Sequence, residues 1–255
     1  MRFVFVAALC AASLYSQEPT LDQILEKNLN AVGGPAIREV QTVKMTATML
    51  IAGNVEVPMT TLIRRPNLIR TEVTYQGQPV VTAFDGTTAW MLAPGSKEPQ
   101  TMDDKSAASL ASADVDSSLG ALALLRTAGH TFELLGKEPV NGKPAYKIRV
   151  TRKNGTVTLY LLDTDSGLPV KIVSTLPQMG QTIEVESYPT AYGKEGPVLM
   201  AHSIDNRVQG RSMMQVTVKK IEFNVNMDDS LFQMPVAPKQ PEKGEEKESE
   251  RSMNR

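Results

Sequence analysis

Cysteine and histidine are both scarce in this chain of 255 residues. The single cysteine, Cys10, lies near the N-terminus, so the rest of the chain holds no disulfide, thiolate metal site or cysteine nucleophile. His130 and His202 are the only histidines, and the 72 positions between them leave little room for a multi-histidine metal centre. We therefore expect structural histidines, and neither a metal nor a cofactor.

An excess of one charge is also missing. Lys and Arg number 27 and Asp and Glu number 28, which gives a formal net charge of −1. Because nucleic-acid binding needs a basic surface, this balance argues against a nucleic-acid partner. The sequence has no Gly-x-Ser-x-Gly elbow, no His-Glu-x-x-His zinc motif and no phosphate-binding glycine loop. We expect that the protein is not an enzyme.

The first 16 residues have the pattern of an export signal. Arg2 supplies the positive start, and Ser16 is a small residue at a plausible cleavage point. The apolar run over 3–12 is about half of the roughly 20 residues that a membrane-spanning helix needs. A buried first helix and a lipid-attachment site at Cys10 are the alternatives. No later run approaches 18 apolar residues, so the pattern predicts a protein exported to the periplasm.

Composition divides the remaining chain into one domain and one tail. Residues 17–237 carry the apolar side chains and are expected to form a single domain. Residues 238–255 contain five basic and five acidic side chains and very few apolar ones. Because such a segment cannot bury enough apolar surface to become ordered, we expect a disordered charged tail.

The domain begins with one amphipathic helix. Thr20 and Gln23 have the spacing of a capping box, which predicts the helix start. Gly33 and Gly34 end the apolar pattern, and Pro35 prevents its continuation. The prediction is a helix of about 13 residues.

After residue 39 the apolar period changes from 3.6 to 2, which indicates strands. Short turns separate five such segments before residue 95, so these strands must form an antiparallel meander. About seven further strands follow residue 130, and the slipped alternation between Val218 and Ile221 predicts a β-bulge.

Residues 103–127 interrupt this pattern. They are rich in Ala, Ser and Leu and poor in β-branched residues, which predicts a helical insert. We expect two short helices, the first capped by Asp103 or Asp104 and the second by Asp114 or Asp116.

About 11–12 antiparallel strands with one apolar face cannot remain flat and open. We therefore predict a mainly β fold with some α-helix. It is a strongly curved antiparallel sheet that forms an unclosed half-barrel, with an N-terminal helix and a central helical lid. A two-sheet sandwich is the alternative, although it needs no apolar helix.

Methionine is as frequent as all aromatic residues together, with 13 of each. Methionine is flexible and polarisable and suits an apolar surface that receives variable ligands, although it also fills ordinary cores. The hydrophobic cavity is expected to be lined by residues of the strands and the insert: Met45, Met49, Met59, Ile69, Val73, Trp90, Leu110, Leu122, Leu125, Ile148, Leu159 and Met200.

Four stretches resemble the LolA/LolB-like superfamily of periplasmic lipoprotein carriers. They are Asn-Ala-Val-Gly-Gly at 30–34, Phe-Asp-Gly-Thr-Thr-Ala-Trp at 84–90, Tyr-Leu-Leu-Asp-Thr-Asp-Ser-Gly-Leu-Pro-Val-Lys at 160–171, and Ile-Glu-Phe-Asn-Val-Asn at 221–226 followed by Phe-Gln-Met-Pro at 232–235. The resemblance implies an unclosed eleven-stranded half-barrel with a helical lid, which holds acyl chains in its concavity. Arg64, Arg65 and Arg70 are the candidates for the arginine of the acyl carriers.

Two functions remain open. The first is an exported, monomeric carrier that binds lipid or lipoprotein acyl chains and exchanges them with an envelope protein as donor or acceptor. The second is an envelope sensor or protein-binding module on the same scaffold. A carrier needs a continuous apolar cavity above roughly 300 Å³, whereas a module would fill the concave face with its own side chains.

Overall fold

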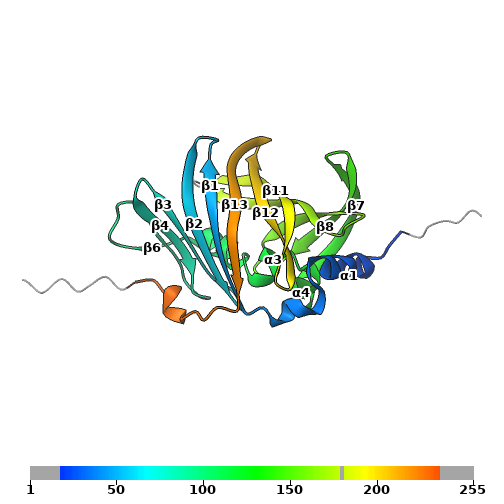
Figure 1. Cartoon of the computed structure of the whole chain (residues 1–255), viewed down its shortest axis with the longest axis horizontal. Helices are drawn as coiled ribbons and strands as arrows, with labels where there is room; N and C mark the ends of the chain where they lie inside the picture. The colour runs from blue at the N-terminus through cyan, green and yellow to red at the C-terminus, as the bar shows by residue number, and fades with distance from the viewer. Residues whose placement is uncertain (1–17, 179–180, 236–255) are drawn as a thin grey trace, which may run out of the picture.

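The computed structural model describes residues 18–178 and 181–235. The predicted export signal over 1–16 and the charged tail over 238–255 lie outside these residues. The described chain forms one antiparallel sheet of 13 strands with a few short helices (Figure 1). The predicted fold, a single curved sheet, is confirmed, and the sandwich alternative is wrong.

The helices precede, interrupt and follow the strands. They are α1 (Leu21–Val32), the 3₁₀-helix η1 (Gly34–Glu39), α2 (Asp104–Ala111), α3 (Val115–Ser118), α4 (Leu122–Thr127) and the 3₁₀-helix η2 (Asp229–Leu231). The strands are β1 (Thr42–Ile51), β2 (Val55–Arg64), β3 (Leu68–Tyr75), β4 (Gln78–Phe84), β5 (Ala89–Leu92), β6 (Gln100–Thr101), β7 (Thr131–Val140), β8 (Lys143–Thr151), β9 (Val157–Asp163), β10 (Pro169–Gln178), β11 (Gln181–Glu195), β12 (Val198–Val208) and β13 (Arg211–Phe223).

The two ends of the strand series meet in the middle of the sheet, where β1 pairs with β13. Strands β2 to β6 extend the sheet on one side, and strands β12 back to β7 extend it on the other. We call these two groups of strands the two wings of the sheet. In the described chain β6 and β7 are the two free edges, so the sheet stays open as a half-barrel. Because the insert α2–α4 connects these two edges, it has to cross the open side of the sheet. Helix α2 contacts β3, β4 and β5 on one wing and β10 on the other.

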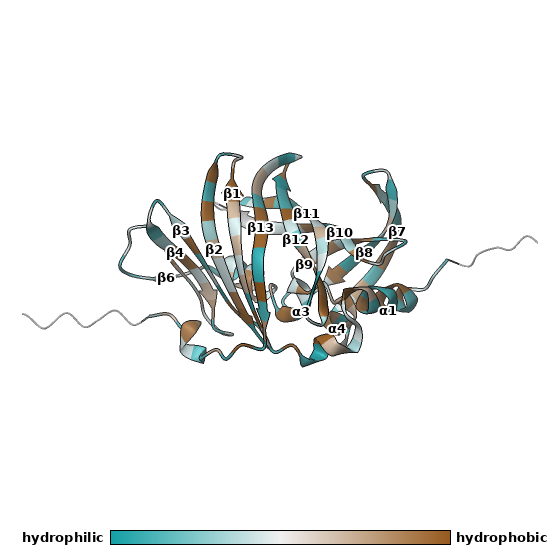
Figure 2. Cartoon of the chain, in the orientation of Figure 1, coloured by the Kyte–Doolittle hydropathy of each residue, from teal (hydrophilic) through white to brown (hydrophobic). Residues whose placement is uncertain are grey.

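The strand predictions follow from local sequence and are largely confirmed. Apolar and polar residues alternate along β1, β2 and β13 (Figure 2). Five strands were expected before the insert, and the structure adds the two-residue β6. The predicted bulge is present, because Thr46 pairs with Lys220 and Ala47 with Val218, which leaves Lys219 without a partner in β1.

Helix α1 begins and ends where its sequence predicts. The Thr20 hydroxyl accepts a hydrogen bond from the Gln23 backbone N–H at 3.3 Å, and the Gln23 side chain accepts from the Thr20 N–H at 2.8 Å. The helix ends at Gly33, which has φ 142°. A Cβ at Gly33 would lie 2.5 Å from the carbonyl oxygen of Pro197. Glycine therefore lets the end of α1 approach the start of β12.

The insert contains three helices, and the prediction of two is wrong. Asp103 caps α2 and Asp114 caps α3, both as expected. The predicted second helix is divided at Gly120, which has φ +67°. Because a residue in this conformation cannot continue a right-handed helix, α4 starts separately at Leu122.

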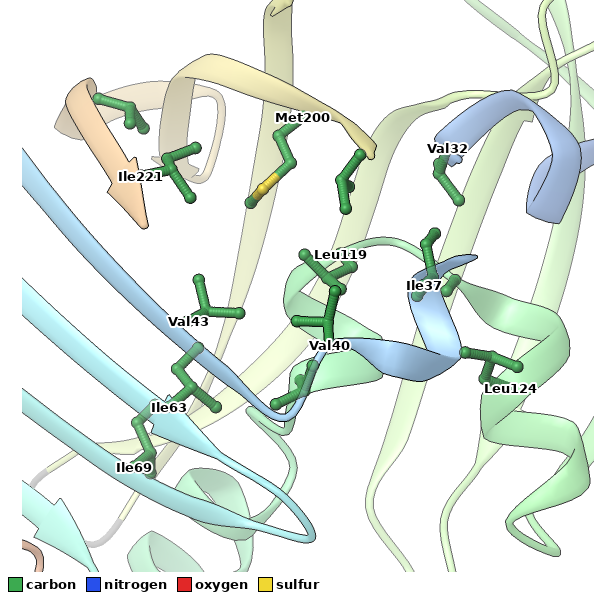
Figure 3. Close-up of a cluster of buried hydrophobic side chains, with 14 of the residues drawn as sticks. Val32, Ile37, Val40, Val43, Ile63, Ile69, Leu119, Leu124, Met200 and Ile221 are labelled. Carbon is green, nitrogen blue, oxygen red and sulfur yellow. The ribbon is translucent and has the colours of Figure 1, made fainter. Parts of the chain in front are cut away.

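The core lies between the helices and the inner face of the sheet, the face that carries Val43, Ile63 and Ile69. Figure 3 shows these side chains turned toward residues of the helical segments, among them Ile37 and Leu119. A second cluster packs α1 and α4 onto the other wing of the same face: Ile24, Leu25, Leu122, Leu125, Ile148, Val150, Tyr160 and Leu162.

Candidate functional site

A cavity of 310 Å³ lies between the helices and the inner face of the sheet. This volume is at the lower end of the roughly 300–1,000 Å³ that small-molecule pockets occupy. Segments of α1 and α3 bound it on one side, and β1, β2 and β10–β12 bound it on the other. The lining residues are Val32, Val43, Met45, Ile63, Ser117, Ser118, Leu119, Gly120, Pro169, Ile172, Ser187, Pro189, Tyr192, Leu199, Met200, Ala201, Ile204 and Asn206.

Close packing between the insert and β10 forms one wall of the cavity. A Cβ at Gly120 would lie 3.3 Å from Cγ of Pro169, so the missing side chain lets the insert approach this strand. From β11, the Tyr192 hydroxyl donates a hydrogen bond to the Pro169 carbonyl oxygen at 2.7 Å. Burial raises the pKa of the Tyr192 phenol, so it remains neutral.

The cavity has no charged wall. Within the described chain, the lining residues include no Asp, Glu, Lys, Arg or His. Arg152 and Asp114 lie behind Ser117, where they form an ion pair at 2.7 Å, and Arg152 also donates to the Ser117 hydroxyl. Their side chains are only 4% and 14% exposed, and the opposite charges compensate each other. The cavity can therefore receive apolar and neutral polar groups.

A second ion pair connects the insert to the wing formed by β2 to β6. Arg65, between β2 and β3, donates two hydrogen bonds to the Asp116 carboxylate, at 2.8 and 2.6 Å. Arg64 and Arg70 instead contact backbone carbonyls of the C-terminal segment 227–231. Of the three candidate arginines, the structure thus brings Arg65 to the insert and the other two to the C-terminal segment.

A buried amide joins α1 to both neighbouring segments. Asn28 is fully buried. Its Nδ2 donates to the Gly167 carbonyl oxygen at 3.0 Å, and its Oδ1 accepts from the Leu122 N–H at 3.0 Å. These bonds give a partner to a carbonyl in the β9–β10 turn and a shorter second partner to the Leu122 N–H, which also contacts the Gly120 carbonyl oxygen at 3.2 Å. Asn28 therefore fixes the position of α4, and with it the end of the insert.

The structure places ten of the twelve predicted cavity residues on the inner face of the sheet or on the helices that cover it. Two of them line the cavity: Met45 and Met200. Three lie further along the same face in a cluster with Val57 and Val216: Met49, Met59 and Val73. Two belong to the central core, Ile69 on β3 and Leu110 on α2 of the insert. Three belong to the cluster between the helices and the other wing, Leu122 and Leu125 on α4 and Ile148 on β8.

Trp90 and Leu159 lie on the outer face, which corrects their expected place. Trp90 follows Ala89, an inner-face residue, and successive strand side chains point to opposite faces. Its Nε1 donates to the Phe232 carbonyl oxygen at 2.7 Å, so the C-terminal segment covers the ring. Leu159 likewise alternates with Tyr160 of the inner cluster.

Sequence reasoning missed the polar part of the cavity. Ser187 and Asn206 are cross-strand partners on β11 and β12, and the Ser187 hydroxyl donates to Asn206 Oδ1 at 2.6 Å. Both are ordinary polar residues on strands, so no local signal marks them. Ala191 has φ 52°, and this irregularity in β11 hides the position of Tyr192 from a simple alternation rule.

The histidines occupy different surroundings. His202 Nε2 lies 2.8 Å from the Glu195 carboxylate. His130 Nδ1 accepts from the Lys153 N–H at 3.3 Å. Partial burial, together with the positive charge of Arg152, lowers the pKa of His130. Among residues 18–178 and 181–235, no three His, Cys, Asp or Glu side chains gather as a metal site.

None of the helices in the described part of the chain combines the length and the apolar character needed to cross a membrane.

Solved structures share this fold at low sequence identity. A LolA superfamily protein from Nitrosomonas europaea is 14% identical, with a TM-score of 0.56 over 85% of this chain and 98% of that one. A DUF1329 family protein from Desulfovibrio piger is 12% identical, with a TM-score of 0.55 over 85% and 98%. A domain from Vibrio parahaemolyticus, described as an outer membrane lipoprotein-sorting protein, is 13% identical, with a TM-score of 0.53 over 82% and 94%.

No protein-family model and no curated protein sequence matches the chain. The structural similarities confirm the LolA-like fold that the sequence motifs predicted. At these identities they concern the fold alone.

Proposed function

We propose that this protein is an exported lipid carrier that holds acyl chains in the cavity beneath its insert. The observation that carries the proposal is the mainly apolar, uncharged lining of a 310 Å³ space on the inner face of the sheet. Each methylene moved from water into such a space contributes roughly 0.8 kcal/mol, so a chain of modest length is bound without any charged contact. The LolA-like fold supports the proposal, because the four sequence stretches resemble a superfamily of periplasmic lipoprotein carriers.

Loading and release require the insert to move. Leu119 and Gly120 form part of the cavity wall, and the insert is fastened on both sides by the Arg65–Asp116 and Arg152–Asp114 ion pairs. Moving the insert opens these two ion pairs and also separates Val115 and Leu119 from the central core, in which both are buried. Export to the periplasm as a monomer, and an envelope protein as donor or acceptor, are parts of the same proposal.

The test is whether the protein binds lipid at this cavity. Protein purified from the periplasmic fraction of a bacterial host is extracted with organic solvent for mass spectrometry. Displacement of the neutral fluorophore N-phenyl-1-naphthylamine by lipids is then measured. Recovery of no lipid, together with no displacement by any lipid, would remove the proposal. Mass spectrometry of the N-terminus in that fraction also tests removal of residues 1–16.

Two tryptophan substitutions, one inside the cavity and one outside it as a control, test where the lipid binds. Ile204 lines the cavity and is half-buried, so Ile204→Trp places a large ring in the ligand space. Leu50 is also half-buried but lies on the opposite face from its neighbour Met49. We expect Ile204→Trp to weaken lipid displacement at least tenfold and Leu50→Trp to leave it within twofold. Equal effects of the two variants would place the ligand elsewhere.

The second candidate, a protein-binding module, has its own supporting observation. Leu122 and Leu125 are 0% and 1% exposed against α1, β8 and β9, so the chain fills that wing of its concave face itself. A module of this kind predicts a folded protein that releases no lipid on extraction. Substitution of Leu122 by Asp is expected to abolish folding under either candidate, because the site is closed core.

A further inference from the structure

The chemical class of the ligand follows from the cavity's electrostatics and from its one polar patch. This inference rests on the proposed carrier function and makes it more specific. An ionised head group buried without a counter-charge or several hydrogen bonds is strongly disfavoured. The charge of the cavity wall is therefore the property that selects among lipids.

The charged residues that flank Asn206 on β12 and those that lie behind Ser117 form ion pairs. Asp205 and Arg207 flank Asn206 on β12, and they bind each other at 2.7 Å. Because side chains alternate along a strand, they lie on the face opposite to Asn206. Behind the α3 wall, Arg152 is compensated by Asp114 at 2.7 Å. None of these four charged side chains therefore presents an unpaired charge to the ligand space.

The neutral polar groups of the cavity are concentrated at Ser187 and Asn206. The α3 serines are committed within the insert, because Ser118 Oγ donates to the Val115 carbonyl oxygen and Ser117 Oγ to the Asp114 carboxylate. Ser187, in contrast, is bound to the other member of the patch, Asn206, and the Asn206 amide carries two N–H donors of its own.

The patch lies at one end of an elongated space. On β12 the lining extends from Leu199 to Asn206, which corresponds to on the order of 20 Å along a strand. The Met200 end is apolar and closed by the central core, and the Asn206 end carries the amide. A volume near the lower limit for ligand pockets, spread over this length, suits one chain rather than several.

We propose that the ligand is an uncharged, single-chain amphiphile whose head group carries hydroxyl or ester oxygens. Its acyl chain lies along β12 toward Met200, and its head group accepts hydrogen bonds from the Asn206 amide. Fatty acids and other singly charged single-chain lipids are bound less well, because nothing in the cavity wall compensates their charge.

Three lipids with the same twelve-carbon chain separate the possibilities at pH 8: 1-monododecanoylglycerol, dodecanoate and dodecyltrimethylammonium. Each is titrated into the purified protein in the presence of N-phenyl-1-naphthylamine, and displacement of the probe is measured. We expect the monoglyceride to act at a concentration at least tenfold lower than either charged lipid. Equal or better displacement by dodecanoate or by the quaternary ammonium lipid overturns the inference while leaving the carrier function intact. If no lipid displaces the probe, the carrier function itself fails.

Variants of Asn206 test whether this residue causes the preference for an uncharged head group. Asn206→Asp keeps the side-chain shape and the acceptor for Ser187 but adds a negative charge. We expect this variant to bind the monoglyceride more weakly. We also expect its affinity for the quaternary ammonium lipid to rise at least tenfold relative to its affinity for the monoglyceride. Asn206→Leu removes the amide donors and should weaken the monoglyceride about fivefold, the effect of one neutral hydrogen bond. An unchanged order of the three lipids in Asn206→Asp would show that the head group lies elsewhere and refute the inference.

Discussion

Replacing Asn28 by Ala tests how the insert is held over the cavity. Asn28 is fully buried and makes two hydrogen bonds of 3.0 Å, one with the Gly167 carbonyl and one with the Leu122 N–H. The substitution leaves both backbone groups without this partner and opens a small void. A buried polar group that loses its partner costs about 1–3 kcal/mol. The Leu122 N–H keeps a longer contact of 3.2 Å with the Gly120 carbonyl, so its share is the smaller one.

We expect Asn28→Ala to lower the free energy of unfolding by about 2–4 kcal/mol, a large part of the 5–15 kcal/mol typical of a domain. Asn30→Ala is the matched control, because Asn30 is on the same helix and exposed. Both changes carry the same small gain in helix propensity, which cancels in the comparison. Urea unfolding followed by circular dichroism gives both values. A difference below about 1 kcal/mol between the two variants would refute the structural role of Asn28.

Three further predictions concern other parts of the fold. Leu125 is 1% exposed, so Leu125→Ala should cost about 2–5 kcal/mol in urea unfolding, and a loss below 1 kcal/mol would contradict its core position. Gly33→Ala should destabilise more than Gly53→Ala, because both have positive φ but only Gly33 would place Cβ 2.5 Å from the Pro197 carbonyl oxygen; equal melting temperatures would argue against this contact. The pKa of His130 is lowered in the folded state, so the unfolded state takes up a proton first as the pH falls through about 6.5. Stability should therefore fall from pH 7 to pH 5, and His130→Asn should reduce this fall in the urea midpoint.

Hairpins, helix ends and the bulge were predictable because neighbouring residues decide them. The capping box at Thr20 and the stop at Gly33 need only the residues beside them. The slip between Val218 and Ile221 reveals the bulge, since one extra residue reverses the alternation. The division of the insert at Gly120 was missed, because a glycine within an apolar pattern can also be tolerated inside a helix.

The cavity was harder to predict, because alternation does not say which face of a strand is the inner one. On β9 the four residues from Leu159 to Leu162 are all apolar, since both faces of this strand are covered. Leu159 was therefore placed on the wrong face. The polar patch was missed for another reason, since Ser187 and Asn206 meet only through the register of β11 with β12.

The sequence alone determined a mainly β chain with one helix before the strands and one helical segment between them, because periodicity, capping and turn chemistry act over a few residues. It also determined that the two groups of strands must bury one apolar face together. Only the tertiary structure decided that β1 and β13 join the groups, that the insert crosses the open side, and that Arg65 reaches Asp116 across 51 positions. Contacts between segments this distant depend on the closure of the whole sheet, which no local pattern records.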